Sequence, residues 1–254
     1  MSLSVAIITF NEEKILTKTL SAISSIADEI IIVDSGSTDN TKNIALEFNA
    51  KFFSETWKGY GPQRNSAIKK CSCDWILNID ADEELSNNLI NKIRKIKKNS
   101  LKEEVFKINF TSVCFGKKLK HGGWSNSYRI RLFRNGAGLF NNNTVHEEFI
   151  TNKKVFSLKE DIYHHSYISL EDYFNKFNRY TTEGALEYYS RGKKASCLQI
   201  IFNPIYKFIK MYVLRLGFLD GIEGLMIATS SAMYSMVKYF KLREIYKNNT
   251  YIKK

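Results

Sequence analysis

Short apolar runs alternate with segments of helical spacing through the first half of the chain. Four runs have the length and composition of buried strands: Leu3–Thr9, Glu29–Asp34, Lys51–Trp57 and Asp74–Asp80. The segments between them carry apolar residues at helical spacing, as at Ile15, Leu16, Leu20 and Ile23. Strands that alternate with helices indicate parallel βαβ crossovers. The pattern therefore predicts an α/β three-layer sandwich with a mainly parallel sheet and helices on both faces.

The pattern changes after Ser86. A helix is followed by β-rich sequence of mixed direction, and then by long segments of helical spacing. We therefore expect a catalytic domain over residues 1–168 and a helical C-terminal extension over residues 169–254. Within the extension, Asn203 and Pro204 predict a helix start, because asparagine caps helices and proline suits their first turn.

The composition is that of a globular protein. The 254 residues are 44% hydrophobic, enough for a sizeable core. The four cysteines lack zinc-site spacing, so we expect reduced thiols. The N-terminus has neither a basic region nor a cleavage site, which predicts a first strand in place of a signal peptide and a cytoplasmic location.

The formal net charge of +12 indicates an anionic partner, which could be nucleic acid, a membrane surface or a phosphorylated substrate. Nine basic residues but only three acidic ones follow Ile200. Aromatic, aliphatic and basic residues interleave there, which favours helices lying on the anionic cytoplasmic membrane surface. The alternatives are ordinary helix packing with a solvated basic face, and a general drift of composition toward lysine.

Four carboxylates crowd the end of the fourth apolar run, at Asp80, Asp82, Glu83 and Glu84. Like charges about 4 Å apart repel by roughly 1 kcal/mol even in water, so a compensating cation is expected. Two carboxylates in an Asp-x-Asp motif at a strand end suit Mg²⁺ or Mn²⁺, with phosphate oxygens completing the coordination. The alternative is that the acids favour the N-terminus of the next helix, Glu84 in particular.

Asn11, Asp34 and Asp80 each follow a predicted strand. The carboxyl ends of parallel strands share one edge of the sheet, where ligands bind in such folds. Asp39 has two open roles, accepting hydrogen bonds from ribose hydroxyls or capping its own helix. Neither a G-x-G-x-x-G nor a G-x-x-x-x-G-K-[ST] motif is present, which argues against dinucleotide oxidoreductases and P-loop phosphotransferases.

Several segments together resemble the successive motifs of family 2 glycosyltransferases with the GT-A (Rossmann-like) fold. They are AIITFNEE (6–13), IIIVDSGSTDNT (30–41), GPQRNSA (61–67) and ILNIDADEEL (76–85). Later segments, including GGWSNSYRIRLFRNGAGLFNNNTVHEEF (122–149), resemble the lipopolysaccharide inner-core β-1,4-glucosyltransferase branch. The resemblance extends from about Leu3 to Leu242. It implies that residues 1–168 bind a nucleotide sugar, and that the extension faces the membrane or the acceptor.

The resemblance also implies roles for residues at matching positions. Donor-nucleotide contacts fall on Thr9, Asn11, Glu12, Asp34, Gln63 and Arg64, with Asp34 at the uracil or ribose. Metal contacts fall on Asp80, Asp82 and His146. Many members take their catalytic base from a Glu-Asp pair that this chain lacks after Asp82. We therefore expect Glu147 as the base, with Glu148 as second choice.

Arginines and histidines complete the candidates. Arg129 and Arg131 share one face of a predicted strand and, with Arg64 and Arg134, are candidates for binding phosphates of donor or acceptor; any edge strand also has one polar face. His164 and His165 are adjacent in a strand and point to opposite faces, so we predict no metal role for them.

Together these features predict a metal-dependent, inverting glycosyltransferase. We expect transfer of a hexose, glucose in the first instance, from a UDP-sugar to a lipid-linked lipopolysaccharide core acceptor at the cytoplasmic membrane. The alternatives are another glycan with a different sugar, such as a capsule or a glycoprotein, and sugar-1-phosphate nucleotidylyl transfer. The latter predicts a glycine-rich first loop, where this chain has TFNEE. No basic and aromatic platform for nucleic acid is evident, so no nucleic-acid partner is expected.

Overall fold

The computed structural model describes residues 1–99, 102–142, 147–167 and 169–252. The chain divides into two compact units. The N-terminal unit comprises Met1–Thr111 and Ser127–His164, and the C-terminal unit comprises Ser112–Asn126 and the chain from His165 onward.

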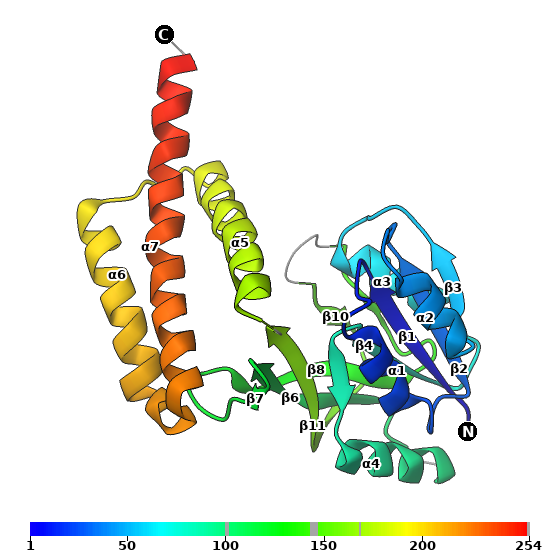
Figure 1. Ribbon diagram of the computed structural model, residues 1–254. Helices are drawn as coiled ribbons and strands as arrows, with labels where there is room; N and C mark the ends of the chain where they lie inside the picture. Colours follow the sequence, from blue (N-terminus) through cyan, green and yellow to red (C-terminus); the bar gives the residue numbers. More distant parts are fainter. Residues whose placement is uncertain (100–101, 143–146, 168, 253–254) are drawn as a thin grey trace. The chain divides into compact units, whose positions relative to one another are not determined.

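Four parallel strands form the first half of the sheet in the N-terminal unit (Figure 1). They are β1 (Leu3–Thr9), β2 (Glu29–Asp34), β3 (Lys51–Ser54) and β4 (Trp75–Asp80), in the order β3-β2-β1-β4. Helices α1 (Leu16–Ile23), α2 (Thr41–Glu47) and α3 (Tyr60–Lys69) connect them. The alternation predicted from the apolar runs is confirmed, because these strands follow the four runs closely.

The sheet continues beyond β4 with strands of mixed direction. The order is β8 (Ser125–Arg134), β6 (Val105–Cys114), β11 (Val155–Tyr167) and β5 (Glu83–Leu85). The β4–β8 and β11–β5 pairs are antiparallel. A separate two-stranded sheet joins β9 (Leu139–Phe140) to β10 (Phe149–Ile150). The α/β fold with a largely parallel first half agrees with the sequence.

Two apolar clusters cover the two faces of the parallel strands. Leu3, Val5 and Ile7 of β1 belong to one cluster, with residues of α1, α2 and α4 (Asn87–Lys98). Ala6 and Ile8 of the same strand belong to the other, with residues of α3. Successive side chains of a strand point to opposite faces, so burial on both sides requires the unbroken apolar runs seen in the sequence.

Glu29 at the start of β2 ties three segments together. Its carboxylate accepts hydrogen bonds from Lys51 Nζ at 2.7 Å, from the Ser72 backbone N–H at 2.9 Å and from the Ser4 hydroxyl. Burial alone would raise the pKa of Glu29, but these bonds outweigh it and lower the pKa from 4.5 to about 2. The carboxylate therefore stabilises the fold above pH 4.5, and this contribution is lost as the pH falls toward 2.

Replacing Glu29 by glutamine should lower the free energy of unfolding at pH 7 by about 1–2 kcal/mol. The deficit relative to wild type should shrink as the pH falls to about 2.5, because the wild-type advantage disappears there. Urea unfolding at both pH values measures this, with the exposed Glu47→Gln in α2 as the matched control. An equal deficit at both pH values would contradict the assignment.

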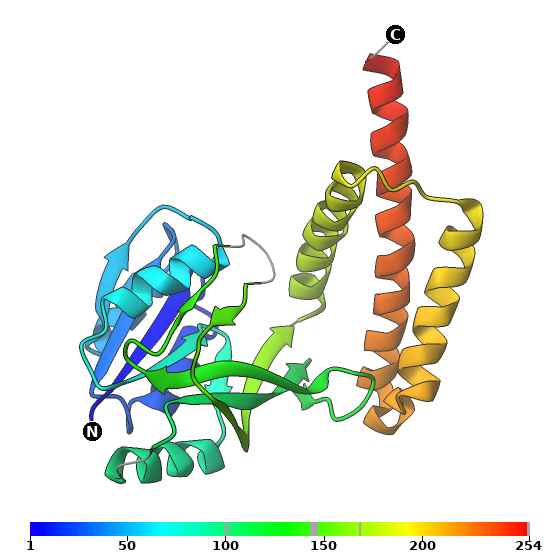
Figure 2. The same ribbon diagram turned by 180° about the vertical axis from the view of Figure 1, so that it is seen from behind.

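Three long helices dominate the C-terminal unit: α5 (Leu170–Ser190), α6 (Cys197–Ile209) and α7 (Gly221–Ile252). Both views place α7 between α5 and α6 (Figures 1 and 2). A π turn, η1 (Lys210–Leu214), and a 3₁₀ turn, η2 (Gly217–Asp220), join α6 to α7, and the short strand β7 (Lys117–Lys118) pairs with the end of β6. None of the helices within the described ranges combines the length and apolar character needed to cross a membrane.

The predicted helix start at Asn203 and Pro204 is wrong. Helix α6 begins at Cys197, where Ser196 caps it and forms a reciprocal capping box with Gln199. The Asn203 side chain instead donates a hydrogen bond to the Tyr239 hydroxyl of α7 at 2.8 Å. The capping box and this contact stabilise the part of the helix that precedes Pro204, so the missing proline donor is tolerated.

Candidate functional site

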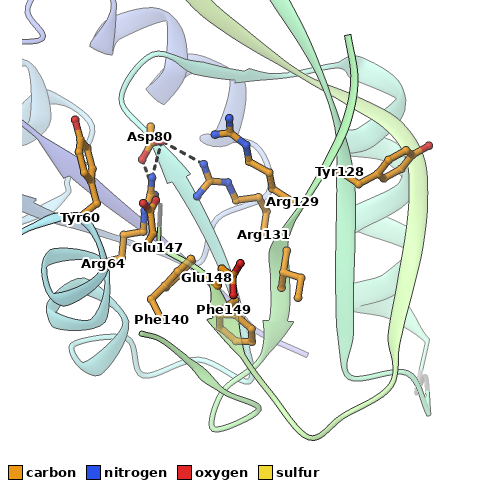
Figure 3. A pocket seen from close by; sticks show the side chains of 11 residues that line it. Tyr60, Arg64, Asp80, Tyr128, Arg129, Arg131, Phe140, Glu147, Glu148 and Phe149 are labelled. Carbon is orange, nitrogen blue, oxygen red and sulfur yellow. Dashed lines mark hydrogen bonds and ion pairs between the residues drawn. The ribbon is translucent and has the colours of Figure 1, made fainter. Parts of the chain in front are cut away.

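A cavity of about 680 Å³ opens in the N-terminal unit beside the carboxyl end of β4 (Figure 3). It is lined by Tyr60, Arg64, Asp80, Tyr128, Arg129, Ile130, Arg131, Phe140, Glu147, Glu148 and Phe149. Six sequence candidates meet in it from separate elements: α3 supplies Arg64, β4 supplies Asp80, β8 supplies Arg129 and Arg131, and Glu147 and Glu148 precede β10. The loop after β4 therefore lies at the centre of a site that side chains from several elements form together.

Each of the four crowded carboxylates has a cationic partner within the chain. The pairs are Asp80 with Arg64 and Arg131, Asp82 with His164, Glu83 with Arg131, and Glu84 with Lys18. Protein side chains therefore provide much of the compensation that the sequence led us to expect from a metal ion. Histidine is the one partner among them that loses its charge near neutral pH.

Asp80 is held between two buried guanidinium groups. Arg64 Nη2 donates to Asp80 Oδ2 at 2.7 Å, with Nη1 on the other carboxylate oxygen, and Arg131 Nη2 lies 3.2 Å from Oδ2. Both arginines are 2% exposed, and both also reach the Asn78 side-chain oxygen. Burial opposes ionisation, but the two arginines hold the pKa of Asp80 well below its usual range. Asp80 thus remains a fixed anion, and its direct contact with a metal stays a prediction.

Glu83 is a structural acid that sequence reasoning placed only at a helix N-terminus. It is fully buried, lies 2.7 Å from Arg131 Nη2, and accepts a hydrogen bond from the Asp80 backbone N–H at 3.0 Å. Burial and the nearby charge of Asp80 raise its pKa. Arg131, expected at a phosphate, therefore lies against Asp80 and Glu83 and links the motif to β8.

Strand pairing brings His164 to the second aspartate of the motif. β5 runs antiparallel to β11 with Glu83 opposite His164, so the preceding Asp82 lies beside the imidazole. His164 Nε2 is 3.2 Å from Asp82 Oδ2. Burial opposes the positive charge, but Asp82 holds the pKa of His164 above its ordinary value. His164 and His165 point to opposite faces of the strand, but this does not exclude a metal site, because such a site can use the imidazole of His164 alone. His146 lies outside the described residues.

Asp82 and His164 are the residues best suited to hold a divalent metal. Their side chains are 21% and 30% exposed, and they bring a carboxylate oxygen and an imidazole nitrogen to one point. No group of three or more potential ligands among His, Cys, Asp and Glu gathers in the part of the chain that the structure describes. The pair therefore fits Mn²⁺ or Mg²⁺ only if phosphate oxygens and water complete the coordination, which is common for nucleotide-binding ions.

Glu147 lies at the cavity wall in contact with Arg64. Arg64 Nε donates to Glu147 Oε1 at 3.1 Å while the terminal nitrogens of the same guanidinium hold Asp80 (Figure 3). Arg64 therefore fixes the distance between Glu147, the predicted base, and the Asp-x-Asp loop. Glu148 also lines the cavity but is exposed, and its backbone N–H donates to Asn141 Oδ1 at 3.3 Å.

The predicted nucleotide residues gather in the loops after β1 and β2. Asp34 is buried and accepts hydrogen bonds from Thr9 Oγ1 at 2.9 Å and from the Gly36 and Ser37 backbone N–H groups at 2.9 and 2.8 Å. Asn11 adopts a left-handed conformation with φ 55° and accepts from the Thr38 N–H at 2.8 Å. These bonds fix the two loops against each other.

The remaining candidates of this region also have protein partners. Asp39 accepts from the backbone N–H groups of Glu13 at 3.1 Å and Thr41 at 3.0 Å, and the Glu12 N–H donates to Thr41 Oγ1 at 2.8 Å. Asp39 thus orders the start of α2, which favours the capping role. Gln63 is buried and reaches Ser35 Oγ at 3.3 Å. Nucleotide contact by these residues stays a prediction.

Comparisons with known proteins show which family this chain resembles. The family model described as glycosyl transferase family 2 matches residues 4–146. An uncharacterized glycosyltransferase of Rickettsia typhi is 33% identical, covering 96% of this chain and 87% of the relative. The lipopolysaccharide core biosynthesis glycosyltransferase LpsC of Rhizobium meliloti is 28% identical, covering 95% of this chain and 92% of its own. The crystal structure of S. aureus TarS 1–349 in complex with UDP aligns with a TM-score of 0.48 and 17% identity over 98% of this chain and 92% of that chain.

The chain belongs to glycosyltransferase family 2. The family model covers more than half of the sequence, and the Rickettsia typhi relative aligns over nearly all of it. The protein is thus a glycosyltransferase, as the motifs predicted.

Proposed function

We propose that this protein is an inverting, metal-dependent glycosyltransferase that moves a hexose from a UDP-sugar to a lipopolysaccharide inner-core acceptor. The observation that carries the reaction is the arrangement around Arg64, which holds Glu147 and Asp80 on one guanidinium at the wall of a sugar-sized cavity. The similarity to LpsC supports the acceptor class, and glucose is the donor sugar that we would test first.

Glu147 acts as the base in this proposal. It takes the proton of the acceptor hydroxyl while the hydroxyl oxygen attacks the anomeric carbon, and the bond from that carbon to the UDP oxygen breaks on the opposite face. Arg64 orients the carboxylate through Nε. Tyr60 lines the same cavity and would contact a sugar ring.

The charge balance of the cavity supports a metal requirement. Arg64 and Arg131 are already paired with Asp80, Glu83 and Glu147, so they add little net positive charge for a diphosphate. Arg129 also lines the cavity, and it has no ion pair among the described residues. A divalent ion held by Asp82 and His164 would supply the missing positive charge to the leaving diphosphate when bound.

The acceptor would be reached at the inner face of the cytoplasmic membrane. A family 2 enzyme acting on another glycan, such as a capsule or a glycoprotein, is the second candidate, because the donor contacts predicted above are with the nucleotide and do not select the hexose. A screen of UDP-sugars against a truncated lipopolysaccharide core and unrelated glycan acceptors separates the two.

Asp82→Asn should reduce UDP release from UDP-glucose and core acceptor by about 10²-fold, because the leaving group loses electrostatic stabilisation. Glu84→Gln in the same loop is the matched control, since Glu84 pairs with the surface residue Lys18 and should tolerate the change. Chelation of divalent ions should reproduce the Asp82→Asn loss in wild type. Undiminished turnover in both the variant and the chelated enzyme would remove the metal from the mechanism, and inactivity with every UDP-sugar would overturn the proposed function.

A further inference from the structure

One side of α6 carries large apolar side chains that the rest of the described C-terminal unit does not cover. No residue of α6 is buried. The exposed residues are Leu198, Ile201, Phe202, Ile205, Tyr206 and Ile209. Their spacing of three and four residues places them on one stripe of the helix, which we call the α6 face. A contiguous apolar patch of this kind marks an interaction surface more often than chance exposure does.

The opposite side of α6 is already occupied. Asn203 contacts Tyr239 of α7, Ile200 packs against the cluster that contains Tyr239, and Phe208 packs beside Met211. The inner side of α6 therefore packs within the helix bundle, whereas the α6 face makes no contribution to that packing.

The apolar patch continues into the turns after α6. Leu214, Phe218, Leu219 and Ile222 are exposed there, and Leu214 and Ile222 are each about two-thirds exposed, at 67% and 68%. The exposed surface thus follows the chain from α6 through η1 and η2 to the first turn of α7, and a short peptide ligand would cover only part of it.

The charge around this surface has one sign. No acidic residue occurs between Glu187 and Asp220, whereas six basic residues do: Arg191, Lys193, Lys194, Lys207, Lys210 and Arg215. Among the described residues, Lys207, Lys210 and Arg215 form no ion pair. Lys207 lies on the α7 side of the helix, one turn after Asn203. Burial and the neighbouring cations Lys210, Arg215 and Lys238 lower its pKa, so these charges lie close enough to repel one another. An anionic partner would relieve that repulsion.

We propose that the α6 face docks on a bilayer surface that contains anionic phospholipid. Phe202, Ile205 and Tyr206 would enter the interfacial region, and Lys210 and Arg215 would meet the lipid phosphates. Apolar residues bordered by lysine and arginine are the composition of helices that lie in a membrane interface. The occupant is less suited to be a second copy, since two such faces would bring like charges together. The inference extends the proposed function, whose acceptor is lipid-linked, but its test requires no sugar transfer.

Vesicle flotation of the full chain tests this docking. The protein should float with phosphatidylcholine vesicles that contain about one-third phosphatidylglycerol, should float poorly with phosphatidylcholine alone, and should be released as salt rises. Lys210→Gln combined with Arg215→Gln should weaken binding by about 30-fold, near fivefold for each charge. Phe202→Ser combined with Ile205→Ser should weaken it at least tenfold, through lost apolar burial.

Matched controls lie in the N-terminal unit. Lys92→Gln combined with Lys95→Gln on exposed positions of α4, and Leu46→Ser on exposed α2, should leave flotation unchanged. Equal flotation of the α6 variants and these controls, or no flotation of wild type, would overturn the proposal. So would a concentration-dependent dimer that Phe202→Ser and Ile205→Ser abolish, because the face would then be covered by a second copy. UDP release measured with a soluble acceptor stays independent of these outcomes, so failure of the docking and failure of the enzyme assignment are distinguishable.

Discussion

Glu147→Gln should lower kcat by about 10²- to 10⁴-fold, the contribution that a positioned general base makes. The amide cannot accept the proton of the acceptor hydroxyl, but it can still accept the hydrogen bond that Arg64 Nε donates to this position. The KM for the UDP-sugar should therefore change by only a few-fold. Steady-state kinetics with saturating acceptor separate the two parameters.

Glu148→Gln is the matched control for this prediction. Glu148 lines the same cavity, but it is exposed, and Arg64 contacts Glu147 instead. We expect kcat to fall by less than tenfold. A large loss in Glu148→Gln with near-normal turnover in Glu147→Gln would transfer the role of base to Glu148, and normal turnover in both would place the base elsewhere.

Arg131→Met should lower the free energy of unfolding by about 3–5 kcal/mol, the usual cost of leaving a buried charge without its partner. The buried Glu83 would lose its guanidinium at 2.7 Å, and Asp80 would keep only Arg64. Urea unfolding at pH 7 measures the loss.

A double variant shows whether the Arg131–Glu83 contact is responsible. Arg131→Met combined with Glu83→Gln removes both charges, so its loss should be smaller than the sum of the two single losses by about 1–3 kcal/mol. Additive losses would mean that Arg131 stabilises the fold through other contacts, such as its reach to Asn78. Unchanged stability in Arg131→Met would contradict the structural role and return Arg131 to phosphate binding.

The first half of the fold was predictable because its strands are buried on both faces. Such strands appear in the sequence as unbroken apolar runs. The residues that follow them must meet at one edge of a parallel sheet. Asp34 and Asp80 were found in this way. Arg64 and Glu147 came from the family resemblance, and in the structure Arg64 contacts both Glu147 and Asp80.

The features that the sequence did not predict depend mainly on pairing between strands that are distant in the sequence. His164 meets Asp82 only because β5 joins β11 in a register that no local pattern encodes. The compensation of Asp80 and Glu83 by Arg131 likewise depends on where β8 joins the sheet. Pro204 misled for a local reason, since a capping box at Ser196 and Gln199 starts the helix about two turns earlier than proline alone would indicate.

Anomalous diffraction from crystals grown with UDP and Mn²⁺ would test the central assignment most directly. We expect one strong manganese peak within coordination distance of Asp82 and His164 Nε2, with the UDP diphosphate on its other side and Glu147 facing the cavity. UDP bound in the cavity without manganese, or manganese held away from Asp82 and His164, would contradict the proposed site.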